Sequence, residues 1–152
     1  MSEFTQVVFT PGLNLAAPLL VEASAGTGKT YNIQNVYLRL ILQEGLTVQQ
    51  ILVVTFTNAA TQELRERLRS VLLHCRYELD CPSGDNPTPD LQRIRNALAL
   101  ANPGQDASHA AILKKRIQIA LMDFDGAAIF TIHGFCKRVL ERYAFECGHD
   151  PD

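Results

Sequence analysis

The sequence predicts an α/β domain in which helices flank a parallel β-sheet. Two observations support this class. Short apolar runs of strand length alternate with longer segments whose apolar residues recur at helical spacing. The apolar runs are also nearly continuous, as in parallel strands covered on both faces. The chain has 152 residues, 47% of them apolar and 20% charged, which is typical of one globular domain with a real core.

The first elements lie around a glycine-rich loop. A short strand is expected near residues 6–10 and a buried strand at residues 19–21. A helix is expected from Lys29, with Gly45 placed to cap its carboxyl end. Its apolar positions at helical spacing are Ile33, Val36, Tyr37, Leu40 and Ile41.

The second strand and helix follow directly. The run ILVVTF at residues 51–56 is rich in branched apolar residues and predicts a buried strand. Asn58 can cap the helix predicted over residues 58–79. The expected core face of that helix comprises Ala60, Leu64, Leu68, Val71 and Leu72.

The remaining chain is predicted to be mostly helical. Residues 81–90 contain three prolines and a glycine and therefore predict a loop. Helices are expected at residues 90–101 and 108–124, so that about residues 80–125 form a helical insertion. A third strand is expected in AAIFTI, residues 127–132, followed by a helix from His133. The apolar side of that last helix comprises Phe135, Val139, Leu140 and Tyr143.

The loop before the first helix matches a phosphate-binding pattern. ASAGTGKT, residues 23–30, fits GxxxxGK[ST] except that alanine stands at the first position. Gly26 and Gly28 can turn successive amides inward and form a concave anion site at a helix start. Lys29 would reach the outer phosphates, and the Thr30 hydroxyl would complete the coordination of magnesium. The alternative is a tight turn followed by a surface lysine.

Polar residues follow the two later strands. In open α/β sheets, ligands bind beyond the carboxyl ends of the strands, so residues 55–58 and 131–133 are expected on the same edge as the phosphate loop. Hydroxyls, an amide and a helix start suit phosphates, and Phe56 could stack on a base. The alternatives are that Phe56 belongs to the core and that Asn58 and His133 only cap helices.

Charge and composition narrow the function classes only slightly. The net charge of −2 gives no general attraction to nucleic acid, which argues against a non-enzymatic DNA-binding module with a basic face. No apolar run nears the ~18 residues that a membrane span requires, and no signal peptide is apparent. We therefore expect a cytoplasmic protein that does not contact membranes. The four cysteines form no CxxC pair.

Three segments together carry a resemblance to a known family. ASAGTGKT, VTFTNAATQELRERL and FTIHGFCKRVL, in this order, resemble motifs I, Ia and the TxH segment of superfamily 1 DNA helicases. EASAGTGKT and IFTIHGFC are most similar to the exodeoxyribonuclease V beta-subunit family of RecBCD-type helicase-nucleases. The resemblance covers about residues 13–145. It implies a P-loop NTPase of the RecA-like fold, with residues 1–152 as the amino-terminal part of the first ATP-binding helicase domain.

The resemblance also implies site residues and partners. Lys29 and Thr30 would be catalytic, with Thr30 on Mg²⁺, and ATP would bind Ala23, Ser24, Ala25, Gly26, Thr27, Gly28, Lys29 and Thr30. Single-stranded DNA would contact Thr55, Phe56, Thr57, Asn58, Thr131 and His133. The implied partners are double-strand DNA ends and the other subunits of a hetero-oligomeric complex. The implied activity couples ATP hydrolysis to DNA unwinding and degradation in the repair of double-strand breaks by homologous recombination.

The sequence departs from the family pattern in its acidic residues. The family has an acidic magnesium-positioning motif after the TxH segment, and no such motif follows here. Asp123 and Asp125 precede that segment, and they are predicted to lie at a solvated helix end. We therefore expect a fragment of a larger subunit that hydrolyses ATP poorly on its own.

A second function stays open at this point. A free-standing phosphate-loop kinase or nucleotide-binding regulator would need its own acidic magnesium ligand and a lid that places arginines over the nucleotide. Arg65, Arg67 and Arg69 are available, but they lie on a helix whose charges are expected to be solvated.

Overall fold

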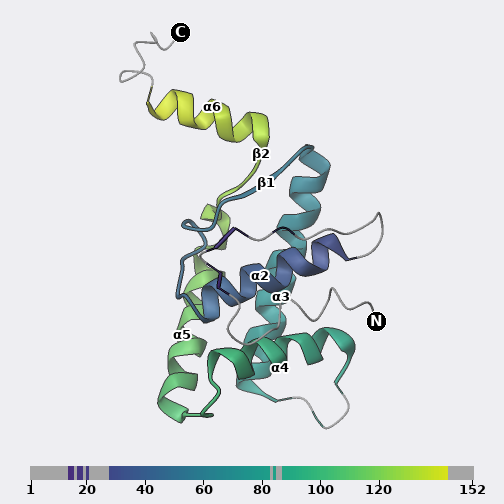
Figure 1. The fold of residues 1–152 in the computed structure, drawn as a ribbon, viewed down its shortest axis with the longest axis vertical. Helices are drawn as coiled ribbons and strands as arrows, with labels where there is room; N and C mark the ends of the chain where they lie inside the picture. The colour runs from purple at the N-terminus through teal and green to yellow at the C-terminus, as the bar shows by residue number, and fades with distance from the viewer. Residues whose placement is uncertain are drawn as a thin grey trace.

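A computed structural model of the chain describes residues 14, 15, 17, 18, 20, 28–82, 84 and 87–143. The elements are α2 (Lys29–Leu42), β1 (Val53–Thr55), α3 (Asn58–Asp80), α4 (Pro89–Ala101), α5 (Ala107–Met122), the 3-10 turn η1 (Phe124–Gly126), β2 (Ile129–Thr131) and α6 (Ile132–Arg142) (Figure 1). The strand predicted near residues 6–10 lies outside the described residues, as does most of the one at 19–21. The structure confirms the α/β class as a mostly helical domain with a small sheet.

The described part of the sheet has two strands, and they run parallel as predicted. β1 pairs with β2 in a register that joins Val53 to Ile129, Val54 to Phe130 and Thr55 to Thr131. The prediction that residues 51–56 are buried on both faces is wrong for the described residues. Ile51 is buried, whereas the side chains of Leu52 and Val54 are about half exposed, because the described elements cover only one face of the strand.

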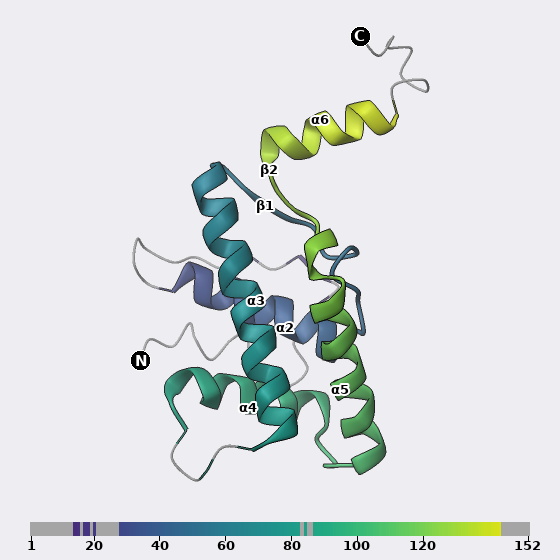
Figure 2. The same ribbon diagram turned by 180° about the vertical axis from the view of Figure 1, so that it is seen from behind.

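Four helices enclose the core of the described residues. α2, α3, α4 and α5 pack against one another, so the segment predicted as a helical insertion contributes directly to the core (Figures 1 and 2). Its status as an insertion into a larger domain stays a prediction. The core face predicted for α3 is confirmed except at Ala60, which is exposed near the helix start. The most deeply buried aliphatic side chains include Leu38, Leu42, Leu68, Leu72, Ile94, Leu113 and Ile117.

Helix α2 lies between two glycines whose backbones adopt the left-handed conformation. Gly28, with φ 92°, precedes its first residue, and Gly45, with φ 69°, lies three residues after its last one. The prediction that Gly45 caps the helix is wrong, because the C-cap is Gln43, whose N–H donates to the Arg39 carbonyl oxygen. Arg116 of α5 donates to the carbonyl oxygens of Leu42 and Gln43, because carbonyls at a helix end have no N–H partner within the helix. The position of α2 is therefore fixed at its carboxyl end by α5.

The packing of α2 differs from the sequence-based expectation. Its fully enclosed side includes the polar Asn35 and Arg39, and the Arg39 Nε donates to the Gln43 Oε1 at 2.6 Å. Of the predicted apolar positions, only Tyr37 and Ile41 are buried. Polar residues are enclosed because α3, α4 and α5 pack around this helix rather than along one stripe of it.

Helix α6 extends away from the four packed helices (Figures 1 and 2). It has no buried residue, and its predicted apolar side is exposed by 37% at Val139, 55% at Leu140 and 42% at Tyr143. Only Phe135 on that side is half-buried, and the described residues leave the rest of it largely exposed. In this described part of the chain, no helix has the length and apolar character needed to cross a bilayer.

Candidate functional site

The start of α2 differs from the starts of the other described α-helices. Among the described residues, no side chain accepts a hydrogen bond at its amino end, where Gly28 precedes the first helical residue. Thr57, Thr88, Asp106 and Thr131 cap α3, α4, α5 and α6 through their side-chain oxygens. The first backbone N–H groups of a helix have no partner within it, so those of α2 can bind an external anion.

Lys29 and Thr30 are the first two residues of this helix. The side chain of Lys29 is exposed, and that of Thr30 is half-buried. Both predicted catalytic residues therefore lie in the first turn, whose backbone N–H groups have no acceptor within the helix. Residues 23–27 lie outside the described residues, so the inward arrangement of their amides stays a prediction. A lysine and a helix start attract phosphate, and a hydroxyl oxygen can be one of the ligands of Mg²⁺.

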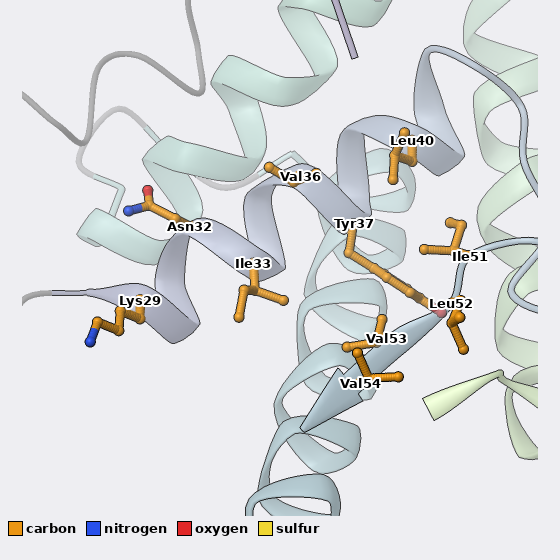
Figure 3. Close-up of a pocket in the computed structure, with 10 residues that line it drawn as sticks. All are labelled: Lys29, Asn32, Ile33, Val36, Tyr37, Leu40, Ile51, Leu52, Val53 and Val54. Atoms are coloured by element: carbon orange, nitrogen blue, oxygen red, sulfur yellow. The ribbon is translucent and has the colours of Figure 1, made fainter. Parts of the chain in front are cut away.

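A groove runs from Lys29 between α2 and β1 (Figure 3). Its volume is about 480 Å³, and its walls are mainly apolar side chains of α2 and of residues 51–54. Lys29 points away from the apolar part, while Tyr37 extends across the groove toward Leu52 (Figure 3). The apolar lining does not suit a triphosphate, whereas the helix start carries the polar groups of the motif.

The carboxyl ends of the two strands form a second polar region. Thr55 and Thr131 are register partners at the ends of β1 and β2, and each strand leads at once into a helix. Thr57 caps α3 by accepting from the Ala60 N–H at 3.1 Å, and Thr131 caps α6 by accepting from the Gly134 N–H at 3.1 Å. Two helix amino termini thus lie at one edge of the sheet. Their positive partial charge would suit the phosphates of a nucleic-acid backbone.

The alternatives left open for this edge are resolved in part. Phe56 is 86% exposed, so the interpretation of this residue as core is wrong. Neither Asn58 nor His133 is a cap, because the preceding threonines take that position, and both side chains are exposed. An exposed aromatic ring beside two helix starts is suited to stacking on a nucleic-acid base.

The two regions open to one side of the molecule. The amino end of α2 and the carboxyl end of β1 point the same way in both ribbon views (Figures 1 and 2). The start of α2 and the strand ends thus lie on one side, whereas the position of residues 23–27 of the phosphate loop stays a prediction.

The arginines proposed above for a kinase lid are engaged within the domain. Arg65 donates to the Ala127 and Ile129 carbonyl oxygens at 3.4 Å, and Arg67 pairs with Glu63 at 2.7 Å. The Arg69 guanidinium lies 5.9 Å from the Phe124 ring centroid. Arg65 is half-buried by these contacts, whereas Arg67 and Arg69 are exposed on α3, as predicted for solvated helix charges. The arrangement of the three side chains along one helix argues against a lid.

No acidic metal site is found among the described residues. Asp123 and Asp125 are exposed at the end of α5 and in η1, as predicted for a solvated helix end. No group of three or more His, Cys, Asp or Glu residues in the described ranges could hold a metal ion. Thr30 is therefore the described residue that the motif assigns to Mg²⁺.

Sequence reasoning missed a polar cluster behind the first turns of α2. Arg93 of α4 is 6% exposed, donates to the Gln34 Oε1 at 2.6 Å and lies over the Tyr31 ring, 4.8 Å from its centroid. An adjoining polar cavity of about 210 Å³ is also lined by Arg67 and His74. No sequence pattern could have revealed the cluster, because Gln34 and Arg93 are 59 residues apart.

Comparison with known proteins now decides the family. Residues 6–152 match the UvrD/REP helicase N-terminal domain. The chain belongs to the UvrD/REP helicase N-terminal domain family. The match includes the start of α2, both strand ends and the helices between them. It confirms the superfamily 1 resemblance and places Lys29 and the threonine edge within a helicase-type domain.

Similar proteins within this helicase group are RecBCD enzyme subunits RecB. That of Escherichia coli K12 is 41% identical over 97% of this chain and 12% of its own length. The Haemophilus influenzae subunit is 40% identical over 85% of this chain and 11% of its length, and the Mycolicibacterium smegmatis subunit is 38% identical over 80% and 10%. The chain thus spans about a tenth of the length of the curated relatives it matches.

Proposed function

We propose that this chain carries the phosphate-binding and DNA-contacting residues of the first RecA-like domain of a RecBCD-type, ATP-dependent DNA helicase. The observation that carries the proposal is the uncapped start of α2, where Gly28, Lys29 and Thr30 occupy the motif positions that bind nucleotide phosphates. The family match over residues 6–152 supports it independently.

ATP and Mg²⁺ would bind at the start of α2. The amides of the first turn and the Lys29 ammonium would hold the phosphates, and the Thr30 hydroxyl would be a ligand of Mg²⁺. The left-handed Gly28 permits the backbone to approach a phosphate closely. Residues 23–27 would complete the loop. The bound metal ion would neutralise charge that develops on the phosphates during transfer.

Single-stranded DNA would bind at the carboxyl ends of β1 and β2. The helix starts at Thr57 and Thr131 would face backbone phosphates, and exposed Phe56 would stack on a base. Asn58 and His133 would add polar contacts. Because α2 and β1 open to the same side, a change at the nucleotide could alter the affinity for DNA, which is the free-energy coupling that a motor requires.

The wider activity is part of the same proposal. By analogy with the RecB subunits, the chain would act in a hetero-oligomeric, cytoplasmic helicase-nuclease that unwinds and degrades DNA from double-strand ends. That activity would serve break repair by homologous recombination. The nuclease residues and an acidic magnesium motif would be supplied by polypeptide outside these 152 residues.

A chimaera tests the proposal at the level of activity. The matching segment of the Escherichia coli RecB subunit is replaced by this chain, and ATP hydrolysis is measured with and without single-stranded DNA. We expect DNA-stimulated hydrolysis that Lys29→Ala lowers by about 100-fold or more, because the phosphates lose their cation. Lys115→Ala, which changes an exposed lysine of α5, is the matched control and should have no effect. Undiminished hydrolysis in the Lys29→Ala chimaera would overturn the proposal.

The kinase alternative makes a different prediction. A kinase would transfer phosphate to a small acceptor without any stimulation by DNA. The engaged state of Arg65, Arg67 and Arg69 argues against it. Acceptor phosphorylation by the isolated chain that DNA does not change would favour the kinase over the helicase.

A further inference from the structure

Arg93 is a charged side chain placed in an almost fully enclosed position. It is 6% exposed, and its burial lowers the pKa of its guanidinium, with partial compensation from nearby Asp90. Burying a cation is costly unless its donors are satisfied in a good geometry. The Arg93 Nη1 donates to the Gln34 Oε1 at 2.6 Å. Its Nε lies 3.3 Å from the Asp90 Oδ1, which is an ion pair without hydrogen-bond geometry, so this donor has no hydrogen-bond partner among the described residues.

The partners of Arg93 on α2 share one helix face. Tyr31 and Gln34 are three residues apart, so they are neighbours on the first two turns of α2. The guanidinium stacks over Tyr31 at 4.8 Å from the ring centroid while it binds Gln34. Tyr31 directly follows Thr30. Arg93 therefore contacts the same turn of helix that presents Lys29 and Thr30.

A planar guanidinium is well suited to fixing this turn. It combines stacking on an aromatic face with directional hydrogen bonds, and it keeps its charge under all physiological conditions. The two contacts to α2 act on different residues of one face, so they restrict rotation of the helix about its axis. The other end of α2 is held by Arg116 of α5, which binds its last carbonyls.

We propose that Arg93 is a positioning residue of the nucleotide site, which it acts on by fixing the first turn of α2 through Tyr31 and Gln34. The inference rests on the proposed function, since it assumes that this turn binds nucleotide phosphates. Arg93 itself touches neither phosphate nor metal. Supporting residues of this kind matter because small displacements of a binding group cost affinity steeply.

A neighbouring arginine supplies a matched control. Arg95 lies on the same helix, and its Nε donates to the Glu78 Oε1 at 2.6 Å. Its Nη2 donates to the Gly84 carbonyl oxygen at 3.2 Å. These partners belong to α3 and to the loop that follows it, so these hydrogen bonds connect α4 to α3 and not to the first turn of α2.

The experiment measures affinity and stability separately. The dissociation constant of a fluorescent ATP analogue with Mg²⁺ is determined for the 152-residue chain, and thermal unfolding is followed without nucleotide. Arg93→Met should weaken binding by about tenfold at a temperature where the variant is folded. Arg93→Lys should restore only part of the affinity. Lysine keeps the positive charge but lacks the planar guanidinium that stacks on Tyr31 and makes directional hydrogen bonds. Arg95→Met should shift the unfolding temperature and leave the affinity within about twofold.

Two further variants keep every outcome informative. Gln34→Ala removes the acceptor of Arg93 and should weaken binding by about threefold even if Arg93→Met does not fold. Lys29→Ala reports on the proposed function itself. The positioning role is wrong if Lys29→Ala loses binding while Arg93→Met and Gln34→Ala bind normally. It is also wrong if Arg93→Met and Arg95→Met lose affinity equally. Either result would leave the proposed nucleotide site itself unaffected. If Lys29→Ala binds normally, or the unmodified chain binds no nucleotide, both inferences fail.

Discussion

Several buried polar atoms of α2 have no hydrogen-bond partner in the part of the chain that the structure describes. They are the Asn32 Oδ1, both side-chain polar atoms of Asn35, and the Tyr37 hydroxyl. A buried donor or acceptor without a partner costs about 1–3 kcal/mol. These residues lie in the turns of α2 that follow the proposed phosphate-binding turn. The helix that begins with the motif therefore also contains buried polar atoms that lower the stability of the folded chain.

Tyr37→Phe should therefore stabilise the chain. The change removes a hydroxyl that is buried without a partner and keeps the ring that fills the groove wall. We expect the free energy of unfolding in urea to rise by about 1 kcal/mol. Tyr77→Phe is the control, because that side chain is 60% exposed and should change nothing. A less stable Tyr37→Phe protein would mean that the hydroxyl has a partner in solution.

The same hydroxyl and a buried thiol predict the response to alkali. Burial raises the pKa of Tyr37 from 10.0 to about 12 and the pKa of Cys75 from 9.0 to about 12. Both groups stay protonated in the folded chain at pH values where the unfolded chain releases its protons. Their contribution to stability is therefore complete below pH 9.0 and is lost as the pH rises toward about 12.

Urea unfolding at neutral pH and above pH 10.0 tests this window. We expect the free energy of unfolding to fall at alkaline pH by about 2 kcal/mol or more. Tyr37→Phe should make the decline shallower, since one of the two titrating groups is removed. An equally steep decline in Tyr37→Phe would contradict the assignment of the effect to that hydroxyl.

At the scale of elements, two helices start with the same cap in different surroundings. Thr57 and Thr131 each accept a hydrogen bond from the third residue that follows, at 3.1 Å. α3 buries Leu64, Leu68 and other residues in the core, whereas α6 buries none. The same chemistry should therefore have different consequences for the stability of the whole chain.

Thr57→Ala should lower the free energy of unfolding by about 1 kcal/mol, because the loss of the cap weakens a helix that forms the core. Thr131→Ala should leave the global value unchanged and speed amide hydrogen exchange within α6 alone. Urea unfolding and residue-resolved exchange distinguish the two. Equal global losses in both variants would show that α6 is packed against the domain in solution.

At the scale of the whole molecule, apolar surface lies beside the candidate site. The groove between α2 and β1 is open (Figure 3), and Val139, Leu140 and Tyr143 on the apolar side of α6 are exposed. The RecB relatives are about ten times longer than the segment that matches. The residues of the candidate site at the start of α2 all belong to the segment that matches these relatives.

Local patterns predicted most of the helices. The helix predicted over residues 58–79 is Asn58–Asp80, because its apolar spacing and polar remainder are unambiguous. The turn after α2 was predictable from Gly45, because glycine readily adopts the left-handed backbone conformation found there. Caps were harder, since Thr57 and Asn58 both suit the position and only the backbone decides between them.

Features that depend on distant contacts could not be predicted. The exposure of Leu52 and Val54 depends on which elements cover β1, and the apolar run alone does not contain that information. The burial of Arg93 depends on the packing of α4 against α2. The GxxxxGK[ST] pattern could be found because its residues are adjacent in the sequence at a fixed spacing. Arg93 is far from that pattern in the sequence, so no spacing could have linked the two.

The most direct test of the account is the response of the backbone amides at the start of α2. Amide chemical shifts of the isotope-labelled chain are recorded during titration with ATP and Mg²⁺, and again with adenosine, which has no phosphates. We predict that ATP with Mg²⁺ causes the largest shifts at Gly28, Lys29, Thr30 and Tyr31, and that adenosine does not cause them. Lys29→Ala should reduce these shifts. Shifts of equal size with adenosine, or ATP-dependent shifts confined to other parts of the chain, would contradict the proposed phosphate site.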